Sequence, residues 1–85
     1  MASTIENDVK QIILVISQLP GTIDDLNNDT TLPELGYTGN MCNQLAQRLD
    51  HYVKSKKTAT GVSNAEIACD ETVQDIIDLI TKKLS

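Results

Sequence analysis

The side chains best suited to chemistry in this chain of 85 residues are two cysteines, Cys42 and Cys69, and one histidine, His51. A structural zinc site needs four ligands, usually thiolates and imidazoles, so we predict no metal site. His51 has no serine or cysteine at a spacing that indicates a catalytic pair, and we expect a partly exposed helix residue. We therefore predict no catalytic residues and no enzymatic activity.

Cys42 has the more distinctive position of the two thiols, because it lies three residues after Gly39, about one turn into a predicted helix. A helix N-terminus can lower the pKa of a thiol, which leaves direct thioester chemistry as one interpretation of Cys42. No base adjoins Cys42 in the sequence, and we favour a small buried hydrophobic residue. Two cysteines cannot make a disulfide-rich scaffold, and we expect both to be reduced.

Composition argues against several classes of protein. Twelve acidic and seven basic residues give a net charge of −5, which argues against a nucleic-acid partner. No apolar run reaches the roughly 18 residues that a membrane span requires, and the N-terminus does not resemble a signal peptide. We expect a cytoplasmic monomer. Aromatic residues make up 2% of the chain, so the core must be aliphatic.

The charge is unevenly distributed along the chain. Residues 1–36 contain six acids and one base, residues 37–62 contain one acid and four bases, and residues 63–85 contain five acids and two bases. The middle segment therefore has a net charge of +3 and lies between two acidic segments.

Three main helices are predicted from apolar residues that recur at intervals of three and four. The core-facing residues are Ile5, Val9, Ile12, Ile13, Ile16 and Leu19 in the first helix, Met41 or Cys42, Leu45, Leu49, Tyr52 and Val53 in the second, and Val73, Ile76, Ile77, Ile80 and Leu84 in the third. Capping pairs support these helices and a further short one. The pairs are Ser3 with Glu6, Ser63 with Glu66 for the short helix, and Thr72 with Asp75.

Two loops connect the predicted helices. Pro20 and Gly21 end the first helix, and residues 21–36 form a long polar loop, of the kind that carries function or a short helix of its own. Its expected anchors in the core are Ile23, Leu26, Leu32 and Leu35. Residues 54–61 lack large apolar side chains and indicate an exposed loop. We predict a single domain, residues 1–85, folded as an all-α antiparallel bundle of three main helices plus one short helix, with a long first loop.

Three stretches carry a family likeness that covers nearly the whole chain. They are Ser3-Thr4-Ile5-Glu6 with Val9, Lys10, Ile12 and Ile13; Asp24-Asp25-Leu26 with Asp29, Leu32, Glu34, Leu35 and Gly36; and Thr72-Val73-Gln74-Asp75-Ile76-Ile77-Asp78-Leu79-Ile80. In order and spacing they resemble the first helix, the long first loop and the last helix of the acyl carrier proteins. These helical bundles carry phosphopantetheine in fatty acid and polyketide synthesis. The resemblance implies a role in lipid or polyketide biosynthesis.

The attachment site of that family is absent from this sequence. Where the family has Asp-Ser-Leu, this chain has Thr38, Gly39 and Asn40. The resemblance therefore places Gly39 at the serine whose hydroxyl oxygen attacks the pyrophosphate of coenzyme A and keeps the phosphopantetheine. Glycine has no oxygen, so we expect no cofactor at the usual position.

Thr38 offers a hydroxyl one residue earlier than Gly39. Phosphopantetheine would be present only if an atypical residue such as Thr38 served as its attachment site. This hydroxyl is more crowded than that of serine, because threonine is β-branched. We favour Thr38 or Asn40 as the cap of the second helix. At Gly39 we expect a backbone turn with positive φ.

The second helix also lacks the acids by which the family docks on basic patches of synthases and of the transferase. Residues 40–50 contain one acid and one base, and Gln44 replaces the usual glutamate. Electrostatic steering by this helix would be largely lost. We predict contacts with proteins, including synthase or transferase enzymes with altered charge complementarity. The partner-binding residues would be Tyr37, Asn40, Met41, Gln44, Gln47 and Arg48.

Three functional interpretations follow. The first is an acyl-carrier-like module that is not phosphopantetheinylated at the usual position and acts through protein–protein contacts. The second is a working acyl or peptidyl carrier, modified at an atypical residue such as Thr38. The third is an unrelated small helical module with a regulatory or interaction role.

Overall fold

The structure is a computed structural model of the chain, and it describes residues 4–18 and 20–85. The described residues form three α-helices, α1 (Thr4–Ser17), α2 (Gly39–Lys56) and α3 (Val73–Leu84). Single turns of 3-10 helix lie between them: η1 (Ile23–Asp25) and η2 (Pro33–Leu35) precede α2, and η3 (Asn64–Glu66) precedes α3. The predicted helical bundle with a long first loop is confirmed. The expected short helix, predicted around Ile67 and Ala68, is present only as the single 3-10 turn η3, which ends before these two residues.

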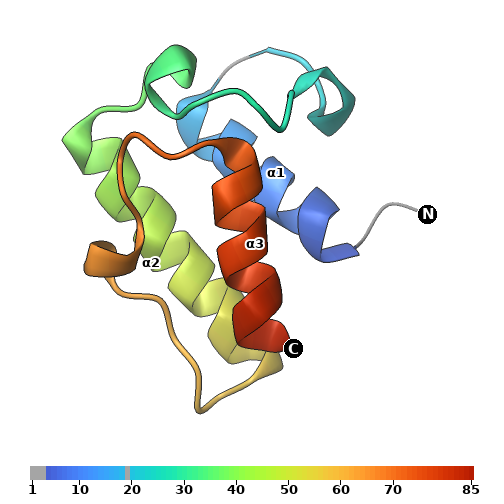
Figure 1. Cartoon of the computed structure of the whole chain (residues 1–85), viewed down its shortest axis with the longest axis vertical. Helices are drawn as coiled ribbons and strands as arrows, with labels where there is room; N and C mark the ends of the chain where they lie inside the picture. The colour runs from blue at the N-terminus through green and yellow to red at the C-terminus, as the bar shows by residue number, and fades with distance from the viewer. Residues whose placement is uncertain (1–3, 19) are drawn as a thin grey trace.

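The three helices pack on one another around a single core. In Figure 1, α2 and α3 run in the same general direction, and α1 passes behind α3 running the opposite way. α1 contacts both α2 and α3, and η3 contacts α2. The beginnings of α2 and α3 therefore lie at the same end of the molecule, next to the long first loop (Figure 1).

The core is aliphatic, as the composition predicts. Its buried helical residues are Val9, Ile13 and Ile16 of α1, Cys42, Leu45, Ala46, Leu49 and Val53 of α2, and Val73, Ile76, Ile77 and Ile80 of α3. Ile5, Ile12, Met41, Tyr52 and Leu84 are half-buried against this cluster. Full burial of one such aliphatic side chain stabilises a fold by roughly 1.5–3 kcal/mol, so these faces supply most of the stability.

Two helix ends differ from the sequence prediction. α1 ends at Ser17, before Pro20, and Gln18 leaves the helix with a φ of 57°. α2 continues to Lys56, so the predicted loop at residues 54–61 begins three residues late. An ion pair between Lys54 and Asp50, with 3.1 Å between Nζ and Oδ2, supports this extra turn. Ser3 and Leu19, which the sequence assigns to the first helix, lie outside the described residues.

The long first loop is held against the start of α3. Thr31 and Thr72 form an isolated antiparallel bridge. The Leu32 amide donates to the Glu71 carbonyl at 2.9 Å, and the Val73 amide donates to the Thr30 carbonyl at 2.9 Å. Two of the four predicted loop anchors, Leu26 and Leu32, are buried, whereas Ile23 and Leu35 are half-buried.

Two of the predicted capping pairs are present. Thr72 accepts from the Asp75 amide at 3.1 Å, and the Asp75 carboxylate accepts from the Thr72 amide at 3.2 Å at the start of α3. Ser63 and Glu66 form the equivalent box at η3, where the Ser63 amide donates to the Glu66 carboxylate at 3.0 Å. Local sequence therefore sets where α3 and η3 begin.

Candidate functional site

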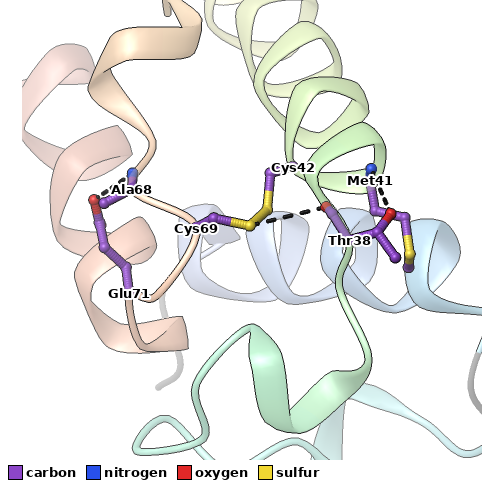
Figure 2. Close-up of a disulfide and its surroundings, with 6 residues drawn as sticks. All are labelled: Thr38, Met41, Cys42, Ala68, Cys69 and Glu71. Atoms are coloured by element: carbon purple, nitrogen blue, oxygen red, sulfur yellow. Dashed lines mark hydrogen bonds between the residues drawn. A yellow bond between two sulfur atoms is a disulfide. The ribbon is translucent and has the colours of Figure 1, made fainter.

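The start of α2 is the region to which the sequence assigns function. Thr38 is the N-cap residue, with extended backbone at φ −98° and ψ 173°. Its hydroxyl oxygen accepts a hydrogen bond from the Met41 amide at 3.3 Å (Figure 2). The predicted capping role of Thr38 is therefore confirmed, and it satisfies one of the amides that a helix N-terminus leaves unpaired.

Gly39 is the first residue of α2 and does not have the predicted positive φ. The expectation was wrong because the left-handed turn is made three residues earlier, at Gly36, whose φ is 81°. Gly39 is exposed, and a Cβ built on it would meet no other group within 4 Å. The backbone at this position therefore accepts any ordinary side chain, including that of serine.

Cys42 and Cys69 form a disulfide, so the expectation that both are reduced is wrong in this structure. The bond joins the first turn of α2 to the turn that precedes α3 (Figure 2), and the two Cα atoms lie 5.9 Å apart. The two cysteine residues are not equally exposed. Cys42 is buried, with 6% of its surface exposed, as the sequence predicts, whereas Cys69 is half-buried.

The Cys69 sulfur also lies next to the N-cap residue. It is 3.8 Å from the carbonyl oxygen of Thr38, along the dashed line in Figure 2. Because this sulfur is bonded to Cys42 it has no hydrogen to donate, so the approach is a van der Waals contact. The disulfide and the cap therefore form one cluster at the beginning of α2.

Four of the predicted partner-binding residues lie on the outside of α2. Asn40, Gln44, Gln47 and Arg48 are exposed, and we call these four residues the amide face. Met41 is half-buried against the core and contributes only part of its side chain to the surface.

Tyr37 does not lie on the surface, in contrast to the prediction. Only 8% of it is exposed, and its hydroxyl donates to the Ile13 carbonyl at 2.6 Å. Burial raises the pKa of Tyr37 above its ordinary value. The residue ties the segment before α2 to α1, so it positions the amide face rather than belonging to it. The sequence around Tyr37 gave no signal that distinguishes a buried anchor from an exposed partner contact.

His51 is exposed on α2, as the sequence predicts. Within residues 4–18 and 20–85, no three histidine, cysteine, aspartate or glutamate side chains converge as metal ligands would. No helix of the described part has the length and apolarity needed to cross a bilayer.

Comparison with known proteins gives no relative for this chain. No protein-family model, no curated protein and no solved structure matches it.

Proposed function

We propose that the chain is an acyl-carrier-like module that has no phosphopantetheine arm of its own and acts in lipid or polyketide biosynthesis by contacting other proteins. Gly39 carries this proposal. It is exposed at the start of α2, where the family resemblance places the attachment serine, and it has no oxygen to bear a phosphodiester.

The nearest hydroxyl is already used in the structure of the helix. The Thr38 hydroxyl oxygen accepts from the Met41 amide, and the Thr38 carbonyl is in contact with the disulfide. A phosphodiester on this oxygen would compete with the helix cap, and the β-branched carbon makes the hydroxyl more crowded than that of serine. Thr38 is nevertheless exposed, which keeps a carrier modified at Thr38 as the second candidate function.

The amide face suits contacts that do not depend on charge. Asn40, Gln44 and Gln47 present both hydrogen-bond donors and acceptors, and Arg48 is the one charged residue of the face. A partner that pairs with these groups would associate without strong steering, so its binding would depend weakly on salt. This differs from the acid-rich second helix that the family resemblance implies.

A cytoplasmic, monomeric state is part of the proposal. Val15, with 49% of its surface exposed, is the one large hydrophobic residue exposed in the described part, which fits a monomer. Disulfides in the cytosol of most organisms are usually transient, catalytic or redox-sensing. A cytoplasmic location therefore requires the bond between Cys42 and Cys69 to be reversible.

Site-specific photocrosslinking tests the contact role of the amide face. A benzophenone amino acid replaces Gln44 or Gln47 in turn, and a matched control carries it at Gln11, an exposed residue of α1. In extracts of the source cells, we expect the two α2 positions to give the same discrete protein adduct and Gln11 to give none. Identical adduct patterns from all three positions would contradict a specific contact through α2.

A further inference from the structure

We propose that the disulfide is a thiol-exchange site, at which Cys69 accepts a small thiol of the glutathione class and Cys42 is the leaving group. The inference rests on the unequal surroundings of the two sulfurs. It does not depend on whether the chain is a carrier-like module.

Access favours attack on Cys69. Cys69 is half-buried in the turn between η3 and α3, whereas Cys42 has 6% of its surface exposed and packs in the core. Thiol–disulfide exchange requires the incoming thiolate to reach the sulfur that it attacks. We therefore expect an external thiolate to reach Cys69 more readily than Cys42.

The position of Cys42 favours its departure. Cys42 lies in the first turn of α2, an 18-residue helix, and its amide donates to the Thr38 carbonyl at 3.0 Å. The partial positive charge at a helix N-terminus stabilises a thiolate, which offsets the cost of forming one at the buried Cys42, and a sulfur that leaves as a more stable thiolate leaves faster. The greater exposure of Cys69 and the position of Cys42 at a helix N-terminus thus favour the same direction of exchange, in which Cys69 is attacked and Cys42 leaves.

The exchange step balances without a further reagent. The thiolate of the small thiol forms a sulfur–sulfur bond with Cys69, the bond between Cys69 and Cys42 breaks, and Cys42 keeps the electron pair as a thiolate. Attack of Cys42 on the mixed disulfide reverses the step and releases the small thiol. A second small thiolate can instead attack the small thiol's own sulfur, which releases a small-molecule disulfide and leaves Cys69 reduced.

The half-buried position of Cys69 favours a small thiol as the attacking group. Its sulfur lies 3.8 Å from the Thr38 carbonyl, on the side of the turn that faces α2 and away from the hydrogen bond that the Ala68 amide donates to the Glu71 carboxylate at 2.8 Å (Figure 2). A flexible tripeptide thiol can enter beside this turn. A folded dithiol protein needs more space than a flexible tripeptide to reach a half-buried residue such as Cys69.

Mass spectrometry of the oxidised wild-type chain tests the direction of exchange. The chain is incubated with reduced glutathione, quenched at successive times with N-ethylmaleimide, and digested for peptide mapping. We expect the singly modified species to carry glutathione on Cys69 and maleimide on Cys42, in about tenfold excess over the reverse arrangement, because access controls which sulfur is attacked. Equal amounts, an excess of glutathione on Cys42, or a disulfide that glutathione leaves intact would overturn the proposal.

Single variants provide a second measurement that does not require trapping an intermediate. With glutathione disulfide as the probe, Cys42→Ala leaves the Cys69 thiol and Cys69→Ala leaves the Cys42 thiol. We expect Cys69 to form its adduct about tenfold faster than Cys42, because Cys42 is buried. Circular dichroism establishes that both variants are folded. Equal rates in two folded variants, or a faster reaction at Cys42, would overturn the proposal.

Discussion

Cys42 and Cys69 are bonded through their sulfur atoms across 27 residues of sequence, which fastens the first turn of α2 to the turn before α3. Between them lie most of α2, the loop that follows it, and η3. The cross-link therefore limits how far the start of α2 and the start of α3 can separate.

Removal of this disulfide is expected to destabilise the fold. A bond that closes a loop of this length stabilises a protein by about 3.5 kcal/mol in the chain-entropy model. The Cys42→Ala/Cys69→Ala double variant should therefore lose roughly that much free energy of unfolding, measured by urea denaturation. Fully reduced wild type is the matched control, and it should show a similar loss. Unchanged stability in both samples would mean that the bond does not constrain the unfolded chain.

Thr38→Ala is expected to weaken the start of α2. The variant removes the hydroxyl that accepts from the Met41 amide, and loss of such a cap costs about 1 kcal/mol. Thr38→Ser is the matched control, because it keeps the accepting oxygen and should retain most of the stability. Urea denaturation measures both, and equal losses in the two variants would show that the hydroxyl does not act as the cap.

Tyr37→Phe is expected to cost about 1 kcal/mol of stability, because it removes a buried hydrogen bond to the Ile13 carbonyl while keeping the ring in place. The raised pKa of Tyr37 adds a pH test. Stability from this group is present below the ordinary tyrosine value of 10.0 and is lost as the pH rises above it, since the unfolded tyrosine ionises first. The variant should therefore lose less stability than wild type above that pH. An equal alkaline loss in both proteins would contradict the buried position of Tyr37.

Glu66 is expected to contribute to the acid dependence of stability. Hydrogen bonds from Lys83, whose Nζ lies 2.6 Å from the carboxylate, and from the Ser63 amide hold the pKa of Glu66 below its ordinary value of 4.5. Stability from this group is present above that value and is lost as the pH falls through the lowered pKa. Glu66→Gln should therefore reduce the loss of stability that accompanies acidification. If the free energy of unfolding falls equally with decreasing pH in wild type and in Glu66→Gln, the prediction is contradicted.

Features fixed by neighbouring residues could be predicted from the sequence. The Ser63–Glu66 and Thr72–Asp75 boxes depend on residues three apart, and the core faces of the helices depend on intervals of three and four. Thr38 was predicted as one of two possible caps, the other being Asn40, because both residue types suit a helix N-cap, and the structure selects Thr38.

Features fixed by tertiary packing could not be predicted in the same way. The disulfide forms because the turn after η3 folds against the start of α2, and two cysteines 27 residues apart carry no signal of that approach. The burial of Tyr37 depends equally on α1, where Ile13 supplies the accepting carbonyl. Gly39 was assigned a turn that the chain makes at Gly36, because neighbouring glycines do not show which of them has the positive φ.

Gly39→Ser is the matched variant for testing whether the chain lacks a phosphopantetheine arm because Gly39 replaces the attachment serine. The substitution should be tolerated, because Gly39 has open space for a Cβ and lies in a helical turn. A second variant, Thr38→Asp/Gly39→Ser/Asn40→Leu, restores all three residues of the family pattern. Aspartate is also a good N-cap, so the start of α2 should be preserved in this variant.

The most direct measurement is the intact mass of wild type and of these variants after incubation with coenzyme A, magnesium and a broad-specificity phosphopantetheinyl transferase. We predict an unchanged mass for wild type and a gain of one phosphopantetheine for Gly39→Ser, and for the triple variant as well. A gain on wild type, traced by peptide mapping to Thr38, would contradict the absence of an arm. An unchanged mass in all three proteins would contradict the carrier-like assignment itself.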